Sequence, residues 1–180
     1  LRILTDLDKE YRDAEFTLTA DLEQADQMNL EAILTLKDTD GKPVMTASSA
    51  PDNGIFRGTY RITNPYKWSD EKPYLYTVTL ELKQDDKVLE RIERSLGFRK
   101  IEIRQRQMYV NGKRTKLAGA CRHEIDPLTG RANTMRHAEQ DVKLLKAANL
   151  NYIRTSHYPP CRELLDAADR IGMYVEVEAP

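Results

Sequence analysis

Apolar and polar residues alternate through the first half of the chain. Small or apolar side chains occupy every second position in the stretches 16–22, 32–36, 56–62 and 76–82. A period of two is typical of β-strands that bury one face and leave the other in water. Asp40–Gly41 indicates a hairpin turn, because glycine accepts a positive φ. Six or seven short strands in about a hundred residues predict an all-β sandwich of the immunoglobulin-like type.

The second half alternates between strand and helix patterns. The first of its two helices carries an apolar stripe made of Met135, Ala138, Val142 and Leu145. We expect Thr134 to cap this helix, Pro159–Pro160 to open the second helix, and Gly172 to close it. Strands are predicted at 116–120, 152–154 and 173–177. The order strand, helix, strand, helix, strand predicts a parallel sheet with right-handed crossovers.

Composition excludes several classes of partner. Hydrophobic residues make up 40% of the 180 positions and charged residues 32%, which is ordinary for a soluble globular protein. The formal net charge of −1 gives no attraction to nucleic acid or to an anionic membrane. No apolar run approaches the length of a membrane span. The chain opens at Leu1 without methionine, so we expect the true amino terminus to be missing, and the compartment stays open.

Two polar clusters follow predicted parallel strands. One contains His123 and the other contains His157. Because the carboxyl ends of neighbouring parallel strands meet at one edge, we expect these two histidines to converge on a site. A lone histidine is more often structural, but two histidines after separate strands favour a site. The alternative is a metal site built from both histidines with Cys121 and Glu178, although no zinc-type spacing supports it.

The residues around both histidines resemble motifs of glycoside hydrolase family 2. The motifs are Arg122-His123-Glu124-x-Asp126-Pro127-x-x-Gly130-Arg131 and Arg154-Thr155-Ser156-His157-Tyr158-Pro159. The first motif is more similar to the family's β-galactosidases, and the second is shared with its β-glucuronidases. The resemblance implies a sandwich over residues 1–103. Residues 104–180 would then be the N-terminal part of a TIM (β/α)8 barrel, truncated after its first three β/α units.

The resemblance also implies roles for particular side chains. His123 and His157 would bind glycone hydroxyls, and Arg154 would orient a nucleophilic carboxylate through a bidentate pair. Glu178 matches a glutamate on the family's third strand and would support the site. Glycoside cleavage needs two carboxylates, for which Glu176 and Glu178 are the internal candidate pair. The family's acid/base and nucleophile lie on later strands, so we expect both beyond residue 180 and assign no catalytic residue in this chain.

The parent protein implied by this resemblance is a retaining enzyme that cleaves terminal β-D-galactosides. Its substrate would be a β-linked oligosaccharide or glycoside, and the fragment by itself is expected to be inactive. Magnesium is implied for the parent enzyme and no cofactor for this chain. A β-glucuronidase is one alternative, and a non-catalytic carbohydrate-binding or interaction module is another. The unpaired edges of a partial barrel also predict self-association of the fragment.

Three further residues are interpreted without a catalytic role. Cys121 and Cys161 are interpreted as free thiols, because two cysteines do not make a disulfide scaffold. Cys121 stands where family galactosidases often have asparagine, which leaves the glycan open. Trp68 lies in a proline-flanked stretch and can either stack on a sugar or pack that stretch onto the sandwich. We favour packing, because the family has a similar Trp-Ser-x-Glu-x-Pro-x-Leu-Tyr run in its sandwich domain.

Overall fold

The computed structural model describes residues 1–23, 29–85, 87–132 and 135–179. The chain divides into two compact units. The first unit contains Leu1–Lys67, Tyr74–Glu102 and Tyr109–Gly112, and the second contains Trp68–Pro73, Ile103–Met108 and Lys113–Pro180. The short segment Trp68–Pro73 therefore belongs to the second unit, although the chain on both sides of it belongs to the first.

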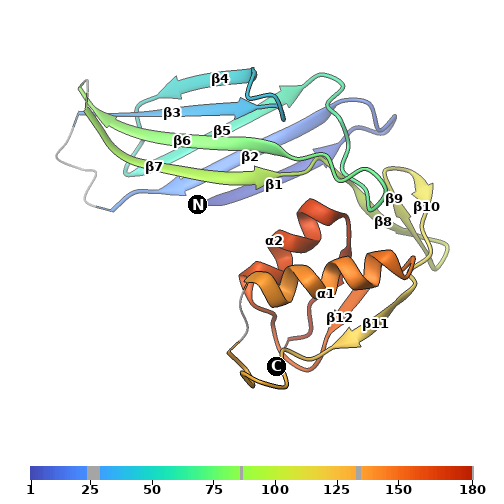
Figure 1. Ribbon diagram of the computed structural model, residues 1–180. Helices are drawn as coiled ribbons and strands as arrows, with labels where there is room; N and C mark the ends of the chain where they lie inside the picture. The colour runs from blue at the N-terminus through green and yellow to red at the C-terminus, as the bar shows by residue number, and fades with distance from the viewer. Residues whose placement is uncertain (24–28, 86, 133–134, 180) are drawn as a thin grey trace. The chain divides into compact units, whose positions relative to one another are not determined.

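The first unit is a sandwich of two antiparallel sheets (Figure 1). One sheet has the order β1-β2-β5, with β1 at Arg2–Leu7, β2 at Ala14–Asp21 and β5 at Ile55–Ile62. The other has the order β4-β3-β6-β7, with β3 at Leu30–Lys37, β4 at Pro43–Ser49, β6 at Tyr76–Gln84 and β7 at Lys87–Leu96. The predicted sandwich is confirmed. The predicted hairpin is also confirmed, since Gly41 has a φ of 78° between β3 and β4.

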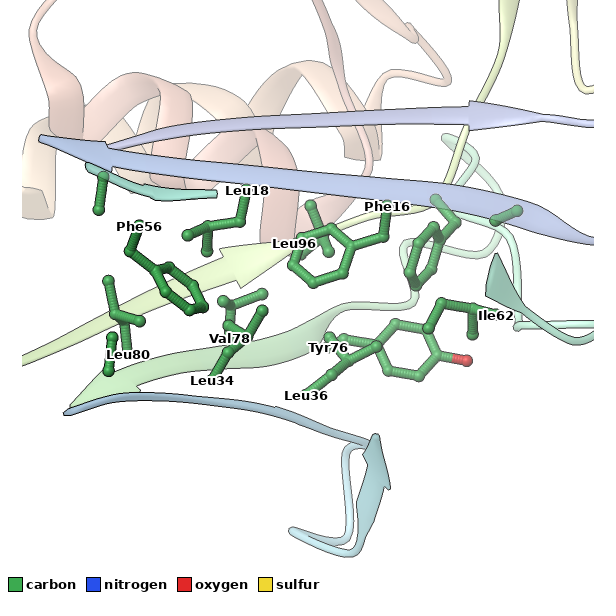
Figure 2. Close-up of a cluster of buried hydrophobic side chains, with 14 of the residues drawn as sticks. Phe16, Leu18, Leu34, Leu36, Phe56, Ile62, Tyr76, Val78, Leu80 and Leu96 are labelled. Carbon is green, nitrogen blue, oxygen red and sulfur yellow. The ribbon is translucent and has the colours of Figure 1, made fainter. Parts of the chain in front are cut away.

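The core of the sandwich is built by alternate residues of the facing strands. Phe16 and Leu18 on β2 and Phe56 on β5 lie opposite Leu34 on β3 and Val78 on β6 (Figure 2). These five side chains are at most 1% exposed. Fully burying one such side chain contributes about 1.5–3 kcal/mol. The alternation in the sequence therefore identifies the residues whose side chains pack between the two sheets.

A small sheet follows the sandwich strands in sequence. It has the order β10-β9-β8, with β8 at Ile101–Arg104, β9 at Gln107–Val110 and β10 at Lys113–Arg114. Asn111 and Gly112 have φ values of 50° and 76°, which suit a type I′ hairpin turn. A Cβ on Gly112 would come within 2.6 Å of the Tyr11 ring, so glycine is needed here for space as well as for its φ.

The second unit contains a parallel sheet of order β11-β12-β13. Strand β11 spans Gly119–Arg122, β12 spans Tyr152–Thr155 and β13 spans Tyr174–Glu176, so the predicted order of strands is confirmed. The first strand begins at Gly119 and not at Lys116 as predicted. The reason is Asn151, whose side chain accepts the Ala118 N–H and donates to the Lys116 carbonyl oxygen. The Asn151 side chain thus supplies hydrogen bonds to Lys116 and Ala118 that a neighbouring strand would otherwise supply.

Helices α1 (Met135–Ala147) and α2 (Arg162–Ile171) pack on one face of this parallel sheet (Figure 1). Met135 is 55% exposed, so the predicted apolar stripe fails at its first position. The predicted cap Thr134 lies outside the described residues. The shared core contains Ala138, Val142, Ile153, Leu164, Ala167, Ala168 and Met173. Neither helix has the length and apolar composition needed to cross a membrane.

The start of α2 differs from the prediction, while its end matches. Pro159–Pro160 precede the helix, and Cys161 is its N-cap with extended φ and ψ of −63° and 153°. Cys161 is held in this conformation because its N–H donates to the Glu124 carboxylate at 2.8 Å. Gly172 closes the helix with a φ of 89° and donates its N–H to the Ala168 carbonyl oxygen.

We call Trp68–Pro73 the strap, because it lies across the residues that precede the parallel strands. Trp68 is 1% exposed, and its Nε1–H donates to the Asp169 carbonyl oxygen at 2.7 Å. Its ring meets Tyr174 edge-on, with centroids 5.6 Å apart. Trp68 is thus a packing residue, as interpreted, but the prediction that it packs onto the sandwich is wrong. The Ser69 N–H donates to the Lys72 carbonyl oxygen and so closes a turn within the strap. The whole strap, Trp68 included, belongs to the second unit.

Asp70 joins the strap to the strands. Its Oδ1 accepts the Tyr174 hydroxyl at 3.0 Å, and its Oδ2 accepts the Asn151 side-chain amide at 3.1 Å. The Lys146 ammonium donates both to the Asp70 carbonyl oxygen at 2.7 Å and to the Gly172 carbonyl oxygen at 2.9 Å. We call this end of the sheet the amino edge; it consists of Trp68, Asp70, Lys146, Asn151, Gly172 and Tyr174.

Candidate functional site

The opposite end of the parallel strands carries the residues singled out from the sequence. His123 directly follows β11, Arg154 lies within β12, and His157 comes shortly after β12. Glu178 follows β13. The parallel register aligns Cys121 with Arg154 and Arg154 with Glu176, so the strands end level with one another. We call this end the carboxyl edge; it consists of His123, Arg154, His157, Glu176 and Glu178.

The two histidines lie next to each other at this edge. Their ring centroids are 5.3 Å apart, and the ring planes are inclined at 77°. Both residues are exposed, and the Ser156–His157 peptide bond is cis. The sequence argument that strand ends bring distant residues together therefore describes this pair correctly. The carboxyl edge therefore carries two exposed imidazoles that lie next to each other.

Glu178 connects the second histidine to the arginine. Its Oε1 lies 3.2 Å from His157 Nδ1, and its Oε2 lies 3.1 Å from Arg154 Nη2. Its backbone N–H donates to Thr155 Oγ1 at 3.0 Å. The contact with Arg154 is an ion pair without hydrogen-bond geometry. Arg154 Nε is buried and has no hydrogen-bond partner among the described residues. Glu178 thus fixes one nitrogen of each neighbour, and Arg154 retains donor capacity.

Glu176, the last residue of β13, makes a separate contact. It accepts a hydrogen bond from the Tyr152 hydroxyl, and its Oε1 lies 3.9 Å from Arg154 Nε. Burial, followed by this carboxylate, raises the pKa of Tyr152 to about 12. Glu176 and Glu178, the internal candidate pair, therefore both neighbour Arg154, although only Glu176 lies within β13. The guanidinium offsets part of their mutual repulsion.

A second carboxylate network was missed in the sequence. Glu124 Oε1 accepts the Cys161 N–H at 2.8 Å and lies 3.3 Å from Arg122 Nη1. Arg122 Nε in turn donates to Asp141 on α1 at 2.8 Å. Burial alone would raise the pKa of Glu124, but the bonds from Cys161 and the charge of Arg122 outweigh it and lower the pKa. The one feature of the sequence that could have indicated a role for Glu124 is that it directly follows His123 in the motif.

The two thiols and the metal alternative can be tested against the same geometry. Cys121 and Cys161 are free, as interpreted. Burial, and then the contact with Glu124, raises the pKa of the Cys161 thiol to about 11. Within the described residues, no three His, Cys, Asp or Glu side chains are arranged to hold one metal ion. His123, His157, Cys121 and Glu178 therefore do not form such a group in the described part of the chain.

Comparison with known proteins agrees with this organisation. Residues 1–99 match the family model of glycosyl hydrolases family 2, and residues 101–180 match the model of that family's TIM-barrel domain. A β-galactosidase of Bifidobacterium adolescentis is 39% identical over 152 residues, covering 84% of this chain and 14% of the relative. A β-galactosidase of Halalkalibacterium halodurans is 32% identical, covering 97% of this chain and 17% of the relative.

A solved structure gives the same result for the fold. The β-glucuronidase of Parabacteroides merdae superimposes with a TM-score of 0.90 at 26% identity, covering 99% of this chain and 23% of the longer one. A sandwich followed by the start of a TIM-barrel domain, with these relatives, defines the class as glycoside hydrolases. The chain belongs to glycosyl hydrolase family 2, and it resembles the family's β-galactosidases. It spans less than a fifth of the length of the two curated relatives.

Proposed function

We propose that this chain is part of a retaining β-galactosidase that removes terminal β-D-galactosyl groups. The observation that carries the proposal is the pair His123 and His157, whose rings lie 5.3 Å apart beyond two neighbouring parallel strands. Sugar recognition needs several hydrogen-bonding groups directed at one ring of hydroxyls, and this edge supplies them. The names of the curated relatives support a galactoside as the substrate.

The contact between His157 and Glu178 defines what His157 can do. With the Nδ1 proton held by the carboxylate at 3.2 Å, Nε2 is the nitrogen left for a glycone hydroxyl. A neutral ring accepts a hydrogen bond there, and a doubly protonated ring donates one. We therefore propose that Glu178 supports the site by fixing the orientation of this ring. His123 binds the same glycone from the end of β11.

Arg154 is proposed to orient the nucleophilic carboxylate. Its Nη2 contacts Glu178, while its Nε has no hydrogen-bond partner among the described residues. A guanidinium with donors to spare can pair with a further carboxylate and keep it ionised. In retaining enzymes the nucleophile and the acid/base lie about 5 Å apart. We propose that both are glutamates beyond residue 180, so this chain alone is inactive.

The proposal is tested in the longer parent enzyme with 4-nitrophenyl β-D-galactoside and 4-nitrophenyl β-D-glucuronide. We expect a higher kcat/KM for the galactoside. Replacing His157 by alanine should lower that kcat/KM by roughly 10- to 150-fold, the equivalent of one hydrogen bond strengthened by charge. Turnover of the galactoside by the 180-residue chain, abolished in Glu176→Gln or Glu178→Gln, would overturn the expected inactivity.

A β-glucuronidase is the second candidate, and the structural likeness to the Parabacteroides merdae enzyme favours it. A uronate carries a carboxylate that needs a cationic or amide partner. The same two substrates distinguish the candidates, because preference for the glucuronide would reverse the assignment. This outcome would leave the proposed positions of His123 and His157 unchanged.

We further propose a domain boundary between residues 103 and 104, with residues 104–180 forming the first three strands of the barrel. In that arrangement β11 and β13 are edge strands that the rest of the barrel would pair. The separate 180-residue chain should then self-associate through these edges. Light scattering at about 100 µM should give a mass above the 20.8 kDa monomer. A monomer at that concentration would contradict this expectation.

A further inference from the structure

The loops that carry the two histidines are bonded to each other on both sides of the histidine pair. Before the histidines, the Ser156 N–H donates to the Arg122 carbonyl oxygen at 2.9 Å. After them, the Glu124 N–H donates to the Tyr158 hydroxyl oxygen at 3.1 Å. Each histidine therefore lies between two cross-links that join the same pair of loops. The second cross-link uses a side chain, so substitution can remove it.

Tyr158 is held in place by more than this bond. Its ring centroid lies 6.0 Å from that of His123 at an angle of 64°. The guanidinium carbon of Arg131 lies 4.9 Å from the centre of the same ring. A cation over an aromatic face at this distance is attracted by the ring quadrupole. The hydroxyl that accepts the Glu124 N–H is thus presented by a ring that itself contacts His123.

Glu124 adds a third link between the loops. Its carboxylate accepts the N–H of Cys161, the N-cap of α2, at 2.8 Å. Its other neighbour, Arg122, is anchored to Asp141 on α1. The backbone N–H and the carboxylate of one residue therefore bind two positions, Tyr158 and Cys161, of the loop that contains His157. Through Cys161 and Asp141, these contacts link the two histidine loops to α2 and α1.

We propose that Tyr158 and Glu124 are positioning residues that set the separation of His123 and His157. The consequence for catalysis rests on the proposed function, since the histidines must meet hydroxyls at fixed positions on one sugar. An error of one ångström in such a site lowers the rate strongly. Tyr158→Phe is the informative substitution, because it keeps the ring against His123 and Arg131 and removes the acceptor for Glu124.

The geometric arm of the test uses the 180-residue chain with labelled histidines. Nuclear Overhauser effects between the two imidazole rings should be present in the wild type. In Tyr158→Phe they should be weaker, because the hydrogen bond that joins the two loops after the histidines is lost. Glu124→Gln keeps an acceptor for Cys161 and should retain them, whereas Glu124→Ala should weaken them. Tyr66→Phe, at a residue that is 69% exposed, is the matched control. Unchanged effects in Tyr158→Phe, or none in the wild type, would overturn the proposal.

The kinetic arm uses the longer parent enzyme and 4-nitrophenyl β-D-galactoside. Tyr158→Phe should lower kcat by roughly 2- to 13-fold, the equivalent of one net hydrogen bond, with a smaller change in KM. A merely structural role would reduce the amount of folded enzyme and leave kcat per titrated site unchanged, which would overturn the positioning role. If the wild-type parent cleaves no galactoside but the histidine contacts respond as described, the proposed function fails and the positioning of the rings stands.

Discussion

The two ends of the parallel sheet β11-β12-β13 use similar side chains in opposite ways. At the amino edge, both oxygens of the Asp70 carboxylate accept a hydrogen bond, and the Lys146 ammonium donates to two carbonyl oxygens. At the carboxyl edge, Arg154 Nε has no hydrogen-bond partner within the described part of the chain, and His157 is exposed. One end of the strands is closed by the strap, and the other presents polar groups to solvent.

This difference shows which residues stabilise the fold and which remain available for a ligand. A buried polar network whose members are all hydrogen-bonded favours one specific structure. A buried polar group without a partner raises the free energy of the folded state unless a ligand binds it. In barrels of this kind, the amino face generally serves stability and the carboxyl face serves chemistry. The Asp70 and Lys146 contacts at the amino edge are those of a bonded structural network, whereas the carboxyl edge leaves exposed polar groups, as this division predicts. Substitutions should therefore separate the edges by their effects.

The largest effect should come from removing the strap's anchor. Trp68→Ala leaves a cavity at a residue that is 1% exposed and removes the donor to Asp169. We expect a loss of about 3–5 kcal/mol in the free energy of unfolding of the second unit. Hydrogen exchange should show lost protection in α2 and β13, with the sandwich strands unaffected. Trp68→Phe, which keeps most of the ring, should cost less. Equal loss of protection in the sandwich would contradict the assignment of the strap to the second unit.

Lys146→Met should have the next largest effect on stability. The substitution keeps an apolar stem of similar length but leaves the carbonyl oxygens of Asp70 and Gly172 without their charged donor. Hydrogen bonds to charged groups contribute about 1.5–3 kcal/mol, and we expect a loss in that range from urea unfolding. Lys143→Met on the same helix is the control, because the Lys143 side chain is 62% exposed. Comparable losses in both variants would mean that the amino edge has no special role.

Much of this arrangement was predictable, and the exceptions have physical causes. The sandwich strands could be predicted from the alternation of apolar and polar residues, which also identifies Phe16 and Leu18 as core residues. In a strand with one buried face, every second side chain is buried. The strap was assigned to the wrong unit, because no local pattern states where a buried Trp68 finds its acceptor 101 positions later. The start of α2 was misplaced because the Cys161 N–H is bound by Glu124, a partner distant in sequence.

The candidate site shows the same division between local and distant information. Strand ends predicted the convergence of His123 and His157, since parallel register brings such positions together whatever the loops between them contain. The bonds from Glu124 to Tyr158 and Cys161 depend on how two loops fold over each other, and no periodicity encodes that. The one indication in the sequence was that Glu124 directly follows His123 in the motif.

Thiol reactivity should test the contact between Cys161 and Glu124 without changing a residue. The pKa of Cys161 is raised from 9.0 to about 11 by burial and then by Glu124, so the fold favours the neutral thiol. Because the folded value exceeds the unfolded one, this contribution to stability is present below pH 9 and is lost as pH rises toward 11. At pH 8, iodoacetamide should modify Cys161 at least about 10-fold more slowly in the folded chain than in urea, because less of the folded thiol is ionised. Peptide mass mapping of the two samples measures the ratio, and equal rates would show that Cys161 is not held against Glu124.

The smallest effect should come from Glu176→Gln at the carboxyl edge. The Glu176 side chain is 58% exposed and lies 3.9 Å from Arg154, a separation at which an exposed ion pair contributes little. A glutamine can still accept the Tyr152 hydroxyl, so the unfolding free energy should change by less than about 0.5 kcal/mol. The pKa of Tyr152 should fall toward its ordinary value, since after burial the increase comes from the hydrogen bond to the Glu176 carboxylate and then from its charge, and ultraviolet titration of tyrosinate would detect this. A loss equal to that of Lys146→Met would mean that both edges contribute alike to stability, and the division between the two edges would fail.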